Sequence, residues 1–255
     1  MIEYINNIIP RLKQFSQDLD KMEVFMDVPW VMIDENLNQQ KYIFKRNGDF
    51  IMSLNGQVTI GRWEYLSKAK SLLIDRIQDK ILLNQNFIDP AVMILKKDGI
   101  QNENFILANE MIIPNLNVNE YLKKLYYEKY NIKVKKIITG EFLEIYYNNS
   151  YALNHHDNKV LKNKVSIDGT TVSDGILELY NSDVRYIIKN SIITGELIKE
   201  SFKTNKGEIV IEHRRYEKPD KGDVVFMNNQ PAPDGKYRLS FLKSITVVNS
   251  QIVKL

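Results

Sequence analysis

The amino-acid sequence predicts a mainly β protein with some helix, of the α+β class. Most of the chain consists of short apolar runs separated by Asn-Gly and Asp-Gly pairs, which favour tight turns between antiparallel strands. Two other stretches repeat their apolar residues at the three- and four-residue spacing of one helix face. The expected order is an N-terminal helix, an antiparallel β meander or small barrel, a connecting helix and a second antiparallel β domain.

Residues 2–22 are predicted to be helical. Their apolar stripe consists of Ile5, Ile8, Leu12, Phe15, Leu19 and Met22. Pro10 interrupts the stripe, so the helix either kinks there or begins near it. A coiled-coil seam has the same spacing, but packing of the helix on the chain's own first β domain explains so short a stripe equally well and is favoured.

The first β domain begins after Pro29. Asn47-Gly48 separates the apolar runs 41–44 and 49–52, which indicates a hairpin, and similar runs continue along the chain. A connecting helix is expected over residues 118–131, because Asn117 and Glu120 have the spacing of a capping box. Three parts are therefore predicted, with the connecting helix ending the second: residues 1–28, 29–135 and 136–255.

The second β domain contains two similar segments, residues 171–193 and 230–252. Aligning the Asp-Gly turn of one with that of the other matches an Asn-Ser pair and several apolar positions. Each segment is expected to form an antiparallel pair in the same register, with Ile188, Ile193, Val247 and Ile252 facing inward. The likeness indicates a hairpin repeat, although the common pattern of β-hairpins is an alternative that stays open.

Composition limits the classes of function. The chain has no cysteine, which excludes disulfides and thiolate sites, and its net charge of +3 is no strong signal for nucleic acid. No apolar stretch reaches the roughly 18 residues of a membrane span, and the first residues do not resemble a signal peptide. We therefore expect a cytoplasmic protein with no membrane partner, and the abundance of Lys, Ile and Asn suggests a bacterial source.

The sequence contains no recognisable catalytic or metal-binding motif. The sequence has neither a Gly-x-Ser-x-Gly elbow nor a phosphate-binding glycine loop. The histidine cluster His155-His156-Asp157 is interpreted as a solvated loop, and the basic run 213–218 as a solvated strand edge. We expect no catalytic residue, no metal and no cofactor.

Tyrosine beside lysine is the most unusual local chemistry. Six lysines and two glutamates give residues 120–136 a net charge of +4, and tyrosines are interleaved with them. Such a surface can hold an acidic partner, since tyrosine packs and hydrogen-bonds while lysine supplies charge. The predicted binding residues are Lys123, Lys124, Tyr127 and Tyr130; the alternative is that they flank a helix and have no binding role.

The function favoured by these observations is a non-catalytic protein-interaction module. It would be an immunity or antitoxin-like protein, or a cytosolic component of a bacterial assembly, with another protein as its partner and its oligomeric state left open. One alternative is a β-barrel that binds a small ligand in a cavity lined by Trp30, Trp63, Phe50 and Phe87. The other is an enzyme with an unrecognised site.

Overall fold

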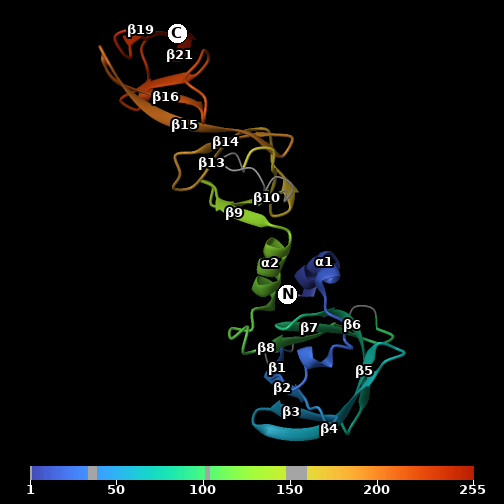
Figure 1. Cartoon of the computed structure of the whole chain (residues 1–255). Helices are drawn as coiled ribbons and strands as arrows, with labels where there is room; N and C mark the ends of the chain where they lie inside the picture. The colour runs from blue at the N-terminus through green and yellow to red at the C-terminus, as the bar shows by residue number, and fades with distance from the viewer. Residues whose placement is uncertain (1, 34–38, 101–103, 148–159) are drawn as a thin grey trace. The chain divides into compact units, whose positions relative to one another are not determined.

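The structure, a computed structural model, describes residues 2–33, 39–100, 104–147 and 160–255 (Figure 1). It is mostly antiparallel β-sheet with two α-helices among these residues, which confirms the predicted fold class. The chain divides into two compact units, Met1–Glu128 and Lys129–Leu255, and each is described by itself. None of the helices in the described part of the chain is long and apolar enough to cross a bilayer.

The first unit contains a closed barrel of eight antiparallel strands, in which each strand pairs with the next and β1 pairs with β8. The strands are β1 (Trp30–Ile33), β2 (Gln39–Phe44), β3 (Asp49–Leu54), β4 (Gln57–Leu66), β5 (Ser71–Asp75), β6 (Lys80–Ile88), β7 (Val92–Lys97) and β8 (Asn104–Asn109). The predicted turn at Asn47-Gly48 joins β2 to β3. Closure leaves the sheet without a free edge.

The barrel core is aromatic and includes part of the segment that precedes β1. Phe25, from this segment, is fully buried and meets the rings of Phe44 and Trp63 edge-on, with centroids 5.5 Å away in each case. The indole of Trp30 donates a hydrogen bond of 2.9 Å to the carbonyl oxygen of Phe25. Leu19 is buried in the same cluster.

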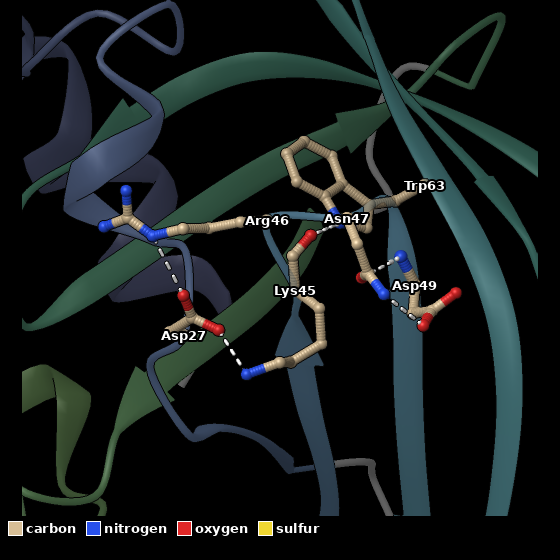
Figure 2. Close-up of polar contacts among 6 residues, drawn as sticks. All are labelled: Asp27, Lys45, Arg46, Asn47, Asp49 and Trp63. Atoms are coloured by element: carbon tan, nitrogen blue, oxygen red, sulfur yellow. Dashed lines mark hydrogen bonds and ion pairs between the residues drawn. The ribbon is translucent and has the colours of Figure 1, made fainter.

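Polar contacts fasten this segment beside the turn between β2 and β3 (Figure 2). Asp27 forms ion pairs with Lys45 and Arg46, and its backbone N–H donates to the carbonyl oxygen of Phe44 at 2.8 Å. The hydrogen bond from Lys45 is the main cause of the lowered pKa of Asp27. The Trp63 indole donates a hydrogen bond of 2.8 Å to the carbonyl oxygen of Lys45. The buried aromatic rings and the surface ion pairs therefore both hold the segment before β1 against the turn between β2 and β3.

Helix α1 (Ile2–Leu12) is followed by the 3-10 turns η1 (Lys13–Phe15) and η2 (Met22–Val24). Its apolar stripe packs in a second cluster of the first unit, which includes Phe87 and Ile94 of the barrel strands. The buried residues that α1 contributes are Ile5, Ile8, Ile9 and Leu12. The packing of this helix on its own domain is thus observed.

The prediction of one helix over residues 2–22 is wrong beyond Leu12. The residues after the helix form hydrogen bonds with barrel strand β6 in place of helical ones. The Gln85 side-chain oxygen accepts the N–H of Leu19 at 2.9 Å, and the Ser16 hydroxyl accepts the N–H of Ile88 at 3.0 Å. The stripe residue Leu19 therefore packs in the barrel core and not on the helix face.

Helix α2 (Val118–Lys129) closely matches the predicted connecting helix. Asn117 caps it, since its side-chain oxygen accepts the N–H of Glu120 at 3.1 Å. Leu122 is buried, and the hydroxyl of Tyr121 donates to the buried carboxylate of Asp89 at 2.8 Å. These contacts fix which face of α2 is exposed.

The second unit is an antiparallel sheet whose strands form two groups, each around its own apolar core. Its strands are β9 (Ile132–Lys136), β10 (Phe142–Tyr146), β11 (Lys164–Ile167), β12 (Thr170–Thr171), β13 (Gly175–Glu178), β14 (Arg185–Lys189), β15 (Ile192–Thr204), β16 (Gly207–Arg214), β17 (Val224–Met227), β18 (Gln230–Pro231), β19 (Gly235–Arg238), β20 (Ser244–Val248) and β21 (Gln251–Lys254). The long strand β15 serves both groups, because its first half pairs with β14 and its second half with β16.

We call residues 132–197 the first module and 198–255 the second module. Each has its own apolar core. Ile188 lies opposite Ile193 in the first, and Val247 lies opposite Ile252 in the second, each beside a register shift at the same place. All four side chains are buried, so the predicted register and facing are confirmed.

Candidate functional site

The predicted binding residues are divided between the two units. Lys123, Lys124 and Tyr127 lie on α2 in the first unit, whereas Tyr130 belongs to the second. Both lysines are exposed: Lys124 pairs with Glu120 at 2.8 Å, and the Lys123 ammonium lies 5.6 Å from the centroid of the Tyr127 ring. The structure therefore presents the first three as one helix surface and places Tyr130 in other surroundings.

Tyr130 lines a hollow of about 420 Å³ whose other lining residues belong to the first module. We call it the tyrosine–lysine hollow, because three tyrosines and two lysines contribute to it. Its lining residues are Tyr130, Tyr146, Tyr147, Lys162, Asn163, Lys164, Asn190 and Ile192. The volume is of the size that accepts a small molecule or a few side chains of a peptide.

Strand register brings part of this lining together. Tyr146 of β10 lies opposite Ile132 of β9 on one side and opposite Lys164 of β11 on the other. Lys164 in turn lies opposite Ile192 of β15. Directly opposed residues of antiparallel strands point to the same face, so four strands contribute to one row of side chains.

A buried carboxylate supports the Tyr146 side chain. Glu144 accepts hydrogen bonds from the hydroxyls of Ser166, at 2.7 Å, and Tyr146, at 3.2 Å. The two hydroxyl oxygens are themselves 3.1 Å apart. Glu144 and Ser166 are both buried, so this group holds the phenol ring of Tyr146 in one orientation.

Tyr147 supplies a second aromatic wall and remains neutral at ordinary pH. Burial, and secondarily the carboxylate of Glu196, raises the pKa of its hydroxyl above the usual value. The Lys133 ammonium lies 5.0 Å from the centroid of the Tyr147 ring, a cation–π arrangement. Tyr147 is thus an uncharged lining residue of the hollow whose side chain also packs against the core of the first module.

The chemistry of the hollow is aromatic, hydrogen-bonding and cationic. Lys162 and Lys164 are both exposed and attract anions, while the tyrosine rings offer flat contact area. In the part of the chain that the structure describes, no group of three or more His, Cys, Asp or Glu residues is placed to hold a metal. The arrangement suits recognition of an acidic, partly apolar group.

The second module has the same strand geometry with other chemistry. In the first module Ile145 lies opposite Val165, and in the second module Ile211 lies opposite Val225. The two modules can be aligned on these two pairs. The positions of Tyr146 and Lys164 are then taken by Glu212 and Val224, and Glu212 forms an ion pair with Arg185. The fold does not require tyrosine and lysine at the hollow.

The other residues that the sequence singled out lie elsewhere. His155-His156-Asp157 falls outside the described residues. The prediction of a solvated edge is wrong for His213, which is 3% exposed, with Nε2 3.1 Å from a Glu200 carboxylate oxygen. His213 lies on β16, which is paired on both sides by β15 and β17, so its side chain is buried within the sheet.

The four aromatic residues expected to line one barrel cavity belong to two clusters. Trp30, Trp63 and Phe50 pack with the barrel core, but Phe87 packs with the residues of α1. The prediction of a common lining is therefore wrong for Phe87, because its side chain points out of the barrel towards the helix.

Sequence reasoning missed the hollow's lysines, Lys162 and Lys164. Nothing in the local pattern marks them, since they become neighbours of Tyr130 only through pairing of strands distant in the sequence. The signal that was present is the run of tyrosines at Tyr146 and Tyr147. No protein-family model, curated protein or solved structure matches this chain.

Proposed function

We propose that this chain is a non-catalytic protein-interaction module whose tyrosine–lysine hollow binds an acidic segment of a partner protein. The observation that carries the proposal is the convergence of Tyr130, Tyr146 and Tyr147 with Lys162 and Lys164 around one hollow. Tyrosine provides large contact area at low entropic cost, and exposed lysines favour encounter with an acidic partner.

The wider role within this proposal is that of an immunity or antitoxin-like protein, or of a component of a bacterial assembly, in the cytoplasm. Composition rich in Lys, Ile and Asn supports the bacterial origin. We further propose that the two modules arose by duplication of one hairpin unit, which the matching registers around Ile188 and Val247 support. On this view, the first module carries the binding surface and the second has lost or never gained it.

Selection of random displayed peptides on the immobilised full chain tests the proposal. We expect enrichment of sequences that combine Asp or Glu with an aromatic residue, because these complement the lining of the hollow. For a selected peptide, Lys162→Ala/Lys164→Ala should raise the Kd about tenfold and flatten its dependence on salt. Fluorescence anisotropy across a salt series measures both effects.

Lys199→Ala/Lys221→Ala is the matched control, because it removes the same charge from exposed positions of the second module. This control should leave the Kd within about twofold of the original, as expected for distant surface charges. Enrichment of basic or purely apolar peptides, or an equal loss of affinity in both double variants, would refute binding at the hollow.

A further inference from the structure

The turn between β19 and β20 carries the two most exposed large apolar side chains among the described residues. Phe241 is 93% and Leu242 is 89% exposed. The turn is closed by hydrogen bonds to the carbonyl oxygen of Lys243 from the N–H groups of Leu239, at 2.9 Å, and Ser240, at 3.2 Å. The backbone therefore has a defined conformation while both side chains project into solvent.

The fold does not require apolar residues at this place. The corresponding turn of the first module, between β13 and β14, is one residue longer and has Asn181, Ser182 and Asp183 at its centre, beside Tyr180, which is 54% exposed. The two turns connect equivalent strands, β13 to β14 and β19 to β20, and the residue pairs of these strands match. Exposure of Phe and Leu costs solubility and gains no packing here, so another contact is the physical reason for them.

Positive charge surrounds the turn. Lys236, Arg238 and Lys243 flank it, and the sequence contains no Asp or Glu from residue 235 to its last residue. The Asn205 side chain accepts the N–H of Arg238 at 2.8 Å, which brings the turn between β15 and β16, with Lys206, to the same end of the module. Glu208, the second residue of β16, is the acidic residue nearest to that turn in the sequence, and cations outnumber it.

We propose that this turn docks on an anionic lipid surface, with Phe241 and Leu242 inserted among the lipids and the surrounding cations on the phosphate groups. The proposal is independent of the tyrosine–lysine hollow. It departs from the expectation of no membrane partner, which rested on the lack of a membrane-spanning stretch, because contact with one face of a bilayer needs no span.

Shape favours lipid over a protein partner. A stable protein interface buries about 800 Å² on each side, whereas a convex five-residue turn with two apolar side chains offers much less. Fluid lipid closes around a convex tip without a preformed pocket. Flexible cations spread over several residues also match the diffuse charge of headgroups better than a fixed set of carboxylates.

Co-sedimentation of the full chain with vesicles tests the proposal. Phosphatidylcholine vesicles that contain phosphatidylserine should bind the protein, and pure phosphatidylcholine vesicles should bind it much less. Phe241→Asn/Leu242→Ser, which installs the polar residue types of the first module, should lower the partition coefficient by at least about tenfold. Lys236→Gln/Lys243→Gln should lower it about fivefold for each lysine, and only on anionic vesicles.

Val58→Ser/Ile60→Ser is the control, because these two apolar side chains are exposed on barrel strand β4. It should leave vesicle binding unchanged. Phe241→Trp adds a reading that does not depend on the double variant, since its emission should shift to the blue on anionic vesicles. Equal binding to both vesicle types, no binding at all, or full binding by the Phe241/Leu242 variant would overturn the proposal and leave the turn to a protein pocket.

Discussion

Asn190 and Ser191 show how two residues set the geometry of a hairpin. Both have positive φ, 52° and 56°, and the equivalent Asn249 and Ser250 have 50° and 61°. Asparagine tolerates this left-handed region better than most residues. The Ser191 hydroxyl also accepts the N–H of Val172 at 3.0 Å and donates to the same residue's carbonyl oxygen at 3.2 Å.

Asn190→Gly and Asn249→Gly should therefore be neutral or slightly stabilising, since glycine adopts positive φ without strain. Ser191→Ala should instead lower the free energy of unfolding by about 1–3 kcal/mol, because it leaves buried polar groups of Val172 without their partner. Urea unfolding curves measure the difference. Ser191→Gly separates the hydrogen bond from the backbone conformation, and an equal loss in Asn190→Gly and Ser191→Ala would contradict this assignment.

Tyr186 makes the second unit sensitive to high pH. Its side chain is 4% exposed, and burial, followed by the carboxylate of Glu196, raises its pKa to about 12. In the unfolded chain the Tyr186 phenol loses its proton near pH 10. The stabilising contribution of the protonated phenol is therefore complete below pH 10 and is lost as the pH rises to about 12.

We expect Tyr186 to lower the free energy of unfolding by about 2–3 kcal/mol over this pH range. Tyr186→Phe should remove this part of the dependence of unfolding free energy on pH. Denaturant unfolding at a series of pH values measures it. Tyr180→Phe, at an exposed tyrosine of the same module, is the control and should keep the slope. An unchanged slope in Tyr186→Phe would show that other groups cause the alkaline loss.

At the scale of elements, helix α2 forms where the local sequence predicts it. Its exposed face carries lysine and tyrosine side chains that are separate from those of the tyrosine–lysine hollow. The Asn117 cap and buried Leu122 fix its start and its inward face. Lys123, Lys124 and Tyr127 remain at the surface, where we propose that they form a further contact for an acidic partner.

Replacing Lys123, Lys124 and Tyr127 together with alanine should weaken binding of a second acidic peptide, selected on a full chain that carries Lys162→Ala/Lys164→Ala, and shift the Tm only slightly. The Lys124–Glu120 pair is exposed and contributes about 0.3–0.5 kcal/mol, so its loss is small. Anisotropy and thermal unfolding are measured on the same samples, with Lys68→Ala/Lys96→Ala as a charge-matched control. A fall of several degrees in Tm with binding intact would assign these residues to structure.

At the scale of the whole molecule, each unit contains its own apolar cores. The barrel core and the cluster under α1 belong to the first unit, and the two module cores belong to the second. A change in one core should therefore act on the stability of its own unit.

Deletion of residues 1–22 should destabilise the first unit and leave the second unchanged. It removes five buried apolar side chains, each worth about 1.5–3 kcal/mol before conformational entropy: Ile5, Ile8, Ile9, Leu12 and Leu19. Hydrogen exchange followed by mass spectrometry reports protection separately for residues 29–128 and 129–255. Unchanged protection and melting of the barrel would refute the packing of this segment.

Local features of the sequence determined the mainly β class, the turns and α2. The Asn-Gly pair after β2, the cap at Asn117 and the inward facing of Ile188 and Val247 follow from sterics and periodicity over a few residues. These constraints act between near neighbours, so they can be read along the chain.

Tertiary structure alone decided the features on which the proposed functions rest. Closure of β1 on β8, entry of Phe25 into the barrel core, and convergence of Tyr130 with Lys164 all join residues far apart in the sequence. The exposure of Phe241 likewise depends on what the rest of the module leaves uncovered. The hydrophobic effect attracts an apolar residue to any apolar surface, so it does not by itself decide which part of the chain the residue packs against. Strand register, barrel closure and the competition for backbone hydrogen bonds make that decision.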